Sequence, residues 1–432
     1  MLSTRQETLT SPTKKANEQK EKRPIWGILA LVLIALSTLF ILYMANVQIR
    51  REHHNNFFEG ELVPVQLQNG EAPLWGYLNE QGEIALPAAY EQAQPFAQNG
   101  LAAVKKNGLW GFINKKGAEV IPCTYAGTLG FGEGRLAPVL QNGLWGYINK
   151  KGELVIAYTF EQADNFADNG LAAVTVDAKK GYINEGGSLV IGATFEQAYP
   201  FDETNRAIVK AFGQWGLINK RGEFVINPQF DRMDPFSACG LALVEKNGRY
   251  GYIDRDGEYA VYPTLYDATP FAINGLAAVC AEEGGLYSYI NAEGRTVIPA
   301  SFVQATPFAL NDLAAVAVSV TEDDGSTSLR WGYINEDGAL VIKTKFFSAT
   351  SFSADLACVR DGQGIHYVNA QGETVFTPAQ SCILAHEFCD DGYAVLEYFD
   401  GQETCYYIEI VNTAGQVIHT HRVYEAIPLE GY

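Results

Sequence analysis

The feature that most constrains this 432-residue chain is a short motif, Trp-Gly-Tyr-Leu-Asn, that recurs along most of its length. Its closing Asn or Asp stands at positions 79, 114, 149, 184, 219, 254, 291, 335, 369 and 412. The first six of these positions are 35 residues apart, and the later steps are 37, 44, 34 and 43 residues. A fixed period of this length indicates a repeat array, in which each unit buries its core against its neighbours.

Each unit carries two turn signals. A Gly follows three residues after the Asn in all ten units, which fits a type I turn closed by a left-handed glycine. Asn-Gly pairs before the Trp, such as Asn107-Gly108, are a strong hairpin signal. In the second unit these turns separate three short strands, 101–104, 109–113 and 119–121, the last ended by Pro122. We therefore expect an all-β fold, a tandem array of about ten three-stranded antiparallel meanders.

The meanders are expected to stack face to face. Along the middle strand of the second unit, Trp110 and Phe112 share one face and Gly111 and Ile113 share the other, so neither face is polar. Aromatic residues begin each connection between meanders (Tyr90, Tyr125, Phe160, Phe195, Phe230, Tyr266, Phe302 and Phe346) and close it (Phe96, Phe131, Phe166, Phe201, Phe236, Phe271, Phe308 and Phe352). We expect these rings to be buried as seals of the edge between neighbouring units. Every meander is intact, and both an open β-superhelix and a closed, propeller-like ring fit the sequence.

A membrane segment precedes the repeats. Residues 25–45 are uncharged and, at about 1.5 Å per helical residue, span a hydrocarbon core of about 30 Å. The apolar region of a cleaved signal peptide is shorter, so we expect an uncleaved transmembrane helix. Five basic residues lie just before the segment and two just after it, which places the N-terminus in the cytoplasm. The expected organisation is a disordered cytoplasmic tail (1–24), a transmembrane helix (25–45), a linker (46–57) and an extracytoplasmic repeat domain (58–432).

Charge and cysteine usage exclude several classes of function. The formal net charge is −19. This charge argues against nucleic acid as a partner and against a repeat domain that lies on an anionic lipid surface. None of the seven cysteines forms a CxxC pair, so no zinc or redox motif is present. Cys382, Cys389 and Cys405 lie close together in the last units, and the sequence leaves open whether a disulfide forms among them.

The core Trp-Gly-[Tyr/Phe]-Ile-Asn-x-x-Gly, followed by Val-Ile-Pro and Gly-Leu-Ala-x-Val, resembles the bacterial WG-repeat (KWG-type) family over roughly residues 58–429. The resemblance implies a binding or scaffold role more than catalysis, and it supplies no catalytic residues to transfer. Lys180, Ser288 and the pair Ile365-His366 depart from the pattern, and we expect their units to pack less well.

No motif for catalysis, cofactor binding or a metal site is apparent, and His419 and His421 lack a third ligand. One stripe of residues has two interpretations: Trp75, Trp110, Trp145, Trp215 and Trp331 share one repeat position, and their rings could stack on sugars or form the structural core. We favour the core, because packing requires the same residue at the same position. The expected protein is a non-enzymatic membrane-anchored scaffold that binds a protein or cell-surface partner. The alternative is a cell-wall glycan-binding module, and an enzyme is a more remote alternative.

Overall fold

The computed structural model describes residues 62–69, 72–79, 84–132, 134–322, 324–379, 382–388, 392–400 and 405–423. The chain divides into two units, residues 1–57 and 58–432, and all of the described residues lie in the second. The predicted tail, transmembrane helix and linker therefore lie outside the described residues. Within the described ranges, no helix is long and apolar enough to cross a membrane.

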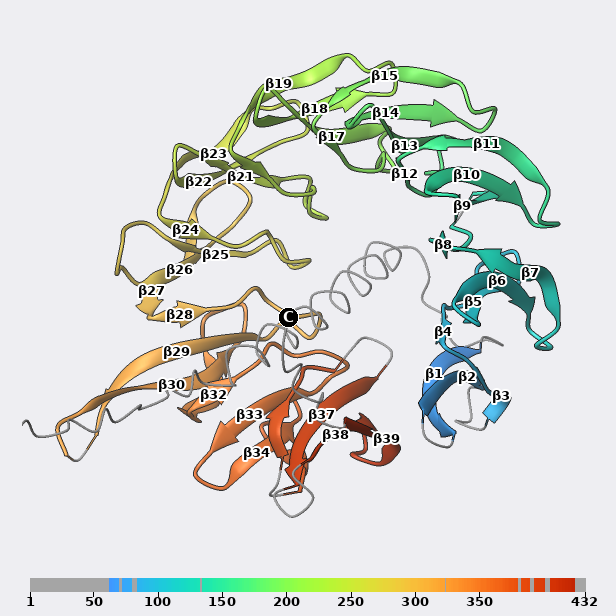
Figure 1. Cartoon of the computed structure of the whole chain (residues 1–432). Coiled ribbons are helices and arrows are strands. Elements are labelled where there is room, and N and C mark those ends of the chain that lie inside the picture. The colour runs from blue at the N-terminus through green and yellow to red at the C-terminus, as the bar shows by residue number, and fades with distance from the viewer. Residues whose placement is uncertain are drawn as a thin grey trace, which may run out of the picture. The chain divides into compact units, whose positions relative to one another are not determined.

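The second unit, taken by itself, is all β over its described residues. Its strands form ten small antiparallel sheets, which we number as blades 1 to 10 in chain order, and the blades follow one another around a ring as in a β-propeller (Figure 1). The short strands, such as β8 (Gly127–Thr128), face the middle of the ring, and the third long strands, such as β11 (Leu154–Phe160), lie at its outside (Figure 1).

The strands of the first five blades have nearly constant lengths. Blade 1 is formed by β1 (Val63–Asn69), β2 (Ala72–Leu78) and β3 (Ile84–Tyr90); blade 2 by β4 (Gln92–Ala93), β5 (Leu101–Lys106), β6 (Leu109–Asn114) and β7 (Glu119–Tyr125); blade 3 by β8, β9 (Leu136–Gln141), β10 (Leu144–Asn149) and β11; blade 4 by β12 (Gln162–Ala163), β13 (Leu171–Val176), β14 (Lys179–Asn184) and β15 (Leu189–Phe195); and blade 5 by β16 (Gln197–Ala198), β17 (Arg206–Ala211), β18 (Gln214–Asn219) and β19 (Phe224–Phe230).

The later blades vary more. Blade 6 is formed by β20 (Arg232–Met233), β21 (Ala242–Lys246), β22 (Arg249–Ile253) and β23 (Tyr259–Leu265); blade 7 by β24 (Asp267–Ala268), β25 (Ala277–Cys280), β26 (Tyr287–Ile290) and β27 (Thr296–Phe302); blade 8 by β28 (Gln304–Ala305), β29 (Ala314–Thr321), β30 (Thr327–Ile334) and β31 (Leu340–Phe346); blade 9 by β32 (Ser348–Ala349), β33 (Ala357–Asp361), β34 (Gly364–Val368) and β35 (Thr374–Phe376); and blade 10 by β36 (Cys382–Ala385), β37 (Tyr393–Asp400), β38 (Cys405–Asn412) and β39 (Val417–Val423).

The prediction of three strands per sheet was wrong for blades 2 to 10, which each have a fourth. The connection that follows a third strand runs back along the first long strand of the next unit. In blade 2, Gln92 and Ala93 pair with Lys105 and Val104 in this way. The extra strand forms because an extended connection can satisfy its backbone hydrogen-bonding groups on the open edge of that strand.

The third strands also run further than predicted, because they continue through the proline. In blade 2, Trp110 pairs with Tyr125 but Phe112 pairs with Ile121, so β7 bulges between these two pairs. Pro122 lies in this bulge on the outermost strand, where a missing N–H removes no ladder hydrogen bond.

The bulge explains the glycine of the Trp-Gly motif. A Cβ added at Gly146 would lie 2.6 Å from the carbonyl oxygen of Ile156 and 3.0 Å from the carbonyl carbon of Ala157. At six other motif glycines an added Cβ would lie equally close, at 2.5–2.7 Å, to the backbone of the third strand of the same blade: Gly76, Gly111, Gly181, Gly216, Gly251 and Gly332. His366 takes this position in blade 9, where β35 ends before the bulge.

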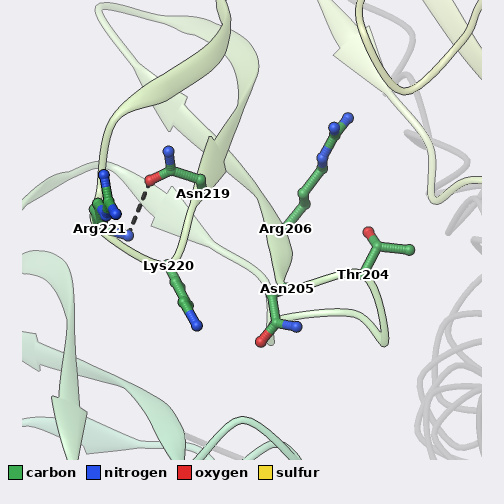
Figure 2. A pocket seen from close by; sticks show the side chains of 6 residues that line it. All are labelled: Thr204, Asn205, Arg206, Asn219, Lys220 and Arg221. Carbon is green, nitrogen blue, oxygen red and sulfur yellow. Dashed lines mark hydrogen bonds between the residues drawn. The ribbon is translucent and has the colours of Figure 1, made fainter.

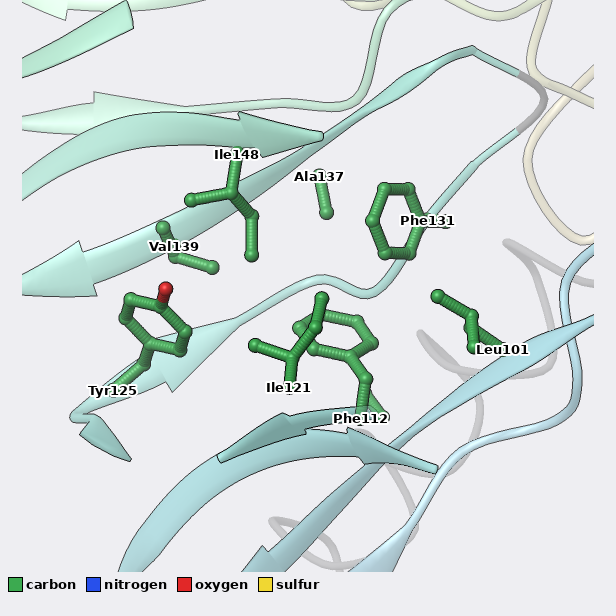
Figure 3. Close-up of a cluster of buried hydrophobic side chains, with 9 residues drawn as sticks. Leu101, Phe112, Ile121, Tyr125, Phe131, Ala137, Val139 and Ile148 are labelled. Carbon is green, nitrogen blue, oxygen red and sulfur yellow. The ribbon is translucent and has the colours of Figure 1, made fainter. Parts of the chain in front are cut away.

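Each seam between blades is filled by a repeated set of side chains. Figure 3 shows the seam of blades 2 and 3, where Phe112 and Ile121 meet Phe131, Val139 and Ile148. The aromatic residue two positions after the motif Trp is completely buried in most blades, and in blade 3 this is Tyr147. Its hydroxyl donates to the carbonyl oxygen of Asp164 at 2.8 Å, and its ring lies 4.9 Å from that of Phe166. Most of the aromatic residues predicted to begin or close a connection are buried as well, among them Phe160 and Phe166, so the predicted seals are confirmed for most blades.

The Asn-x-x-Gly turns have the predicted geometry and add a contact between blades. In blade 3, Asn149 Oδ1 accepts hydrogen bonds from the backbone N–H groups of Lys151 and Glu153, and Gly152 has a φ of 80°. A Cβ added at Gly152 would lie 3.2 Å from Cγ2 of Ile121 in the preceding blade. The turn glycine thus supplies both a left-handed backbone and a close approach to the previous unit.

The first and last blades meet, which the sequence did not decide. Strand β39 of blade 10 contacts β1 of blade 1. The same relation, a third strand against the next first long strand, joins β3 to β5 and β31 to β33. The tenth seam therefore follows the geometry of the others, and the ring is closed.

Candidate binding surfaces

The five motif tryptophans lie at the margin of the seams. All of them are half-buried and pack against the core clusters without belonging to their fully buried set: Trp75, Trp110, Trp145, Trp215 and Trp331. The Trp215 ring lies 5.5 Å from the ring of Tyr199, and the Nζ atom of Lys210 lies 5.7 Å from it. The indoles are therefore partly covered by other side chains.

Lys180 occupies the tryptophan position in blade 4 and has a specific partner. Its Nζ atom lies 3.7 Å from a carboxylate oxygen of Asp164. Burial raises the pKa of the Asp164 carboxyl, and the Lys180 ammonium opposes this shift. The sheet keeps the strand register of its neighbours, so the departure from the motif is accommodated by an ion pair.

The sheets expose two different sets of loops at their two ends. We call one end of the ring the hairpin rim, because it carries the hairpins between the first and second long strands. The other end, the turn rim, carries the Asn-x-x-Gly turns. In blades 2 to 6 the hairpin is two residues long, and in blades 2, 4, 5 and 6 it is capped by a carboxylate from the preceding connection. Glu91, for example, accepts a hydrogen bond from the N–H of Gly108.

The added residues of blades 7 and 8 lengthen the hairpin rim. In blade 7, residues 281–286 separate β25 from β26, and the exposed side chains of Glu282 and Glu283 make no ion pair among the described residues. In blade 8, β29 and β30 extend to eight residues each. At their tip, hydrogen bonds from Ser326 hold the pKa of the Asp324 carboxyl below its ordinary value.

Large apolar side chains are exposed along the same rim. Phe212, in the hairpin of blade 5, is 90% exposed. Tyr266, Leu286 and Phe347 are 40–47% exposed. Tyr266 was predicted to begin a connection as a buried seal, and this was wrong: Leu265 pairs with Tyr250 in that position. Because of this shift by one residue, Tyr266 occupies the position that Glu91 has in blade 2, where Glu91 caps the hairpin. Phe347 occupies the same position in its own connection.

A shallow pocket of about 300 Å³ lies on the turn rim of blade 5 and is lined by Thr204, Asn205, Arg206, Asn219, Lys220 and Arg221. Figure 2 shows Arg206 and Lys220 extending away from each other. The Arg206 guanidinium donates to the carbonyl oxygen of Arg255 and pairs with Asp256 in blade 6 at 3.1 Å. Arg255 in turn pairs with Asp202 at 2.7 Å. Arg206 and Arg255 therefore join blades 5 and 6, and each of them pairs with a carboxylate.

Some titratable side chains among the described residues have structural partners, such as His386 and Glu397. No group of three or more His, Cys, Asp or Glu side chains within the described ranges could hold a metal ion. His386 Nε2 lies 2.7 Å from the carboxylate of the buried Glu397. Burial raises the pKa of the Cys358 thiol to about 12, so this thiol stays protonated near neutral pH. Cys382 is also a free thiol, Cys389 lies outside the described residues, and the side chain of Cys405 is not described.

The repeat geometry agrees with the comparison against protein families. The model of the WG containing repeat matches residues 75–110, 110–145, 145–179, 181–211, 215–250, 250–284, 287–318 and 331–363, more than half of the chain. The chain belongs to the WG-repeat family. The family resemblance expected from the motif is thereby confirmed for this WG-repeat protein.

Comparisons with other proteins add little. No curated protein matches the sequence. A solved structure of the eukaryotic initiation factor is 12% identical, covering 84% of this chain and 96% of that one, with a TM-score of 0.47. A quinonprotein alcohol dehydrogenase-like protein from Bacteroides thetaiotaomicron is 11% identical, covering 74% and 82%, with a TM-score of 0.30. Hsv2p from Kluyveromyces lactis is 9% identical, covering 68% and 96%, with a TM-score of 0.29. Similarities at these scores support no inference about function.

The residues that sequence reasoning missed are those of the hairpin rim. Phe212 stands where Asn107, Asn142 and Asn247 stand in other blades, and Tyr266 and Phe347 stand where Glu91 does. The sequence signal that could have identified these residues was a departure from the repeat pattern at a solvent-facing position.

Proposed function

We propose that this WG-repeat protein is a binding scaffold and not an enzyme, anchored in a membrane by residues 25–45 with its ring outside the cytoplasm. The ring binds a protein partner through the hairpin rim. One observation carries this proposal: the residues that blades 7 and 8 add to the 35-residue period lengthen hairpins on this one rim. Loops that a rigid scaffold holds in place are where proteins concentrate their binding residues.

The membrane anchor is supported by the uncharged stretch 25–45 and by the basic residues in front of it. Protease added to intact spheroplasts of cells that express the full chain tests this part. Release of the ring together with protection of a tag on the N-terminal tail is the expected result. Protection of the ring, or its recovery in the soluble fraction, would contradict the proposed topology.

The binding part is tested by photo-crosslinking in the same cells. A photoreactive residue is placed at Leu286 on the hairpin rim or, as a control, at Leu310 on the turn rim, both of which are exposed. We expect a discrete protein adduct from position 286 and none from position 310. Adducts of equal yield from both rims would count against a hairpin-rim partner.

The glycan alternative is tested with purified protein and isolated peptidoglycan. Retention on the glycan that is lost on Trp145→Ala substitution, in a protein that remains folded, would replace the protein partner with a glycan. Because Trp145 packs against a seam, circular dichroism must accompany the binding measurement.

A further inference from the structure

Phe212 is an unusual residue for the place that it occupies. It is 90% exposed and has a φ of 55°, a left-handed backbone conformation that bulky side chains rarely adopt. Asn107, Asn142 and Asn247 hold the equivalent hairpin position with φ values of 52–54°, and Asn tolerates that conformation. The chain therefore keeps a Phe where Asn would fit the turn better. The strained backbone of this exposed residue points to a role in binding.

Three more exposed apolar side chains lie on the hairpin rim between blades 6 and 9. Tyr266 hydrogen-bonds through its backbone N–H to Cys280 of blade 7, whose hairpin carries Leu286. Phe347 makes the equivalent backbone hydrogen bond to Arg360 of blade 9. Since stacked sheets lie about 10 Å apart, the arc from blade 5 to blade 9 is about 40 Å long. We call these three residues, together with Phe212, the apolar arc.

Among the described residues beside the apolar arc, the positively charged side chains have partners within the protein, whereas two carboxylates do not. The cations have partners within the protein: the guanidinium groups of Arg249 and Arg330 lie over the rings of Tyr266 and Phe347, at 5.9 Å and 4.6 Å, and Arg330 also pairs with Glu322. The exposed carboxylates of Glu282 and Glu283 pair with no cation in the part of the chain that the structure describes. A complementary surface would therefore bring positive charge.

We propose that the apolar arc binds a protein segment in which Lys or Arg side chains surround an apolar stripe. Phe212 and Leu286 enter the apolar stripe of the partner, and Glu282 and Glu283 pair with its cations. This inference rests on the proposed scaffold function and names the chemistry of the partner.

The probe is a synthetic 24-residue amphipathic peptide of Leu and Lys, which spans about 36 Å as a helix. The same peptide with Glu in place of Lys is its counterpart. The full-length protein in nanodiscs of uncharged lipid is titrated by fluorescence anisotropy. We expect the Lys peptide to bind, with an affinity that falls as salt increases, and the Glu peptide not to bind.

Two pairs of variants locate the site. Phe212→Asn with Leu286→Ser should weaken binding at least tenfold. The control pair Ile273→Ser with Leu310→Ser removes side chains that are 62% and 77% exposed on the turn rim, and it should leave binding unchanged. Glu282→Gln with Glu283→Gln should weaken binding several-fold, and Glu336→Gln with Asp337→Asn on the turn rim should not. Phe212→Asn alone should raise the melting temperature, which separates loss of binding from loss of fold.

Equal effects of the hairpin-rim and turn-rim variants, or equal binding of the two peptides, would overturn the inference. The crosslinking experiment at position 286 tests the scaffold function independently of the peptide titration. An adduct at 286 together with indifferent peptides keeps the scaffold function and rejects the basic partner. Selective binding of the Lys peptide without any adduct in cells keeps the site and rejects the scaffold function.

Discussion

Blades 1 to 6 are more regular than blades 7 to 10. The closing Asn of the motif, which is Asp254 in blade 6, recurs every 35 residues in blades 1 to 6, whereas the later intervals are 37, 44, 34 and 43 residues. Residues 58–265 contain 17 basic and 24 acidic side chains, a net charge of −7, and residues 266–432 contain 6 and 22, a net charge of −16. The buried tyrosine hydroxyls nevertheless make the same hydrogen bond in both regions. The comparison shows that the seams restrict their own residues strongly and leave the hairpins and surface charge free to diverge.

If the two regions depend on one closed ring, removing a regular blade should destabilise both of them. Deleting residues 127–161, one whole period, keeps the register of the chain but prevents β1 and β39 from meeting at the present seam angles. We expect the melting temperature to fall by about 10 °C or more, because the closing seam is lost. Circular dichroism and calorimetry measure this. A variant as stable as the parent would mean that the blades form an open stack.

The glycine of the motif should be indispensable in the regular region and less so in the irregular one. Gly146→Ala forces a methyl group against the bulged backbone and should cost about 3 kcal/mol of unfolding free energy. Blade 7 carries Ser288 in the same place and keeps the same register shift, so Ser288→Gly should change stability by less than about 1 kcal/mol. Chemical denaturation compares the two. A loss for Gly146→Ala as small as that for Ser288→Gly would show that the close approach at Gly146 has no energetic weight.

The buried tyrosines should respond alike in the two regions. Tyr147→Phe and Tyr367→Phe each remove a hydroxyl that donates to a carbonyl, of Asp164 at 2.8 Å and of His386 at 2.6 Å. Each should cost about 1–2 kcal/mol, because the carbonyl oxygen loses its side-chain donor inside a seam. Phe112 shows that the seam of blade 2 tolerates a ring without a hydroxyl. A much smaller cost at Tyr367 would show that the seam of blade 9 is looser than that of blade 3.

Salt should affect the acidic region more than the regular one, although only slightly. Raising the ionic strength from 0.01 M to 0.15 M shortens the screening length from about 30 Å to about 8 Å and weakens repulsion between carboxylates. Amide hydrogen exchange in β29 and β30 should then slow by about two- to fivefold relative to β9 and β10. Mass spectrometry of the exchanged protein measures this. Equal slowing of all four strands would mean that the excess negative charge carries no local cost.

Much of this fold was predictable, because its elements are written into one short period. The Asn-x-x-Gly turn, the hairpin and the buried ring two residues after the motif Trp all follow from local rules, and Gly152 and Tyr147 meet them. The short fourth strand could not be read from Gln92 and Ala93, because a two-residue strand exists only when the neighbouring strand is already in place. Closure depends on the angle between blades, which no single unit specifies.

The candidate site was harder to predict. The tryptophans repeat at one position of the motif, as a residue that supports the repeated structure does, and they lie half-buried at the margin of the seams. The residues of the apolar arc were visible only as exceptions: Phe212 in an asparagine position, and Tyr266 and Phe347 in a glutamate position. What distinguishes these residues is their exposure and, at Phe212, the backbone angle, and both depend on the folded chain.

The contact of β39 with β1 has a consequence for biosynthesis. A ribosome that adds about 5–20 residues per second delivers β39 roughly 20–70 s after β1. During this interval the first sheet lacks the neighbour that will cover one of its sides, however well the intervening units have assembled. The newborn polypeptide must therefore be shielded from aggregation until its final strand emerges, and truncated translation products should be the ones that chaperones and proteases remove.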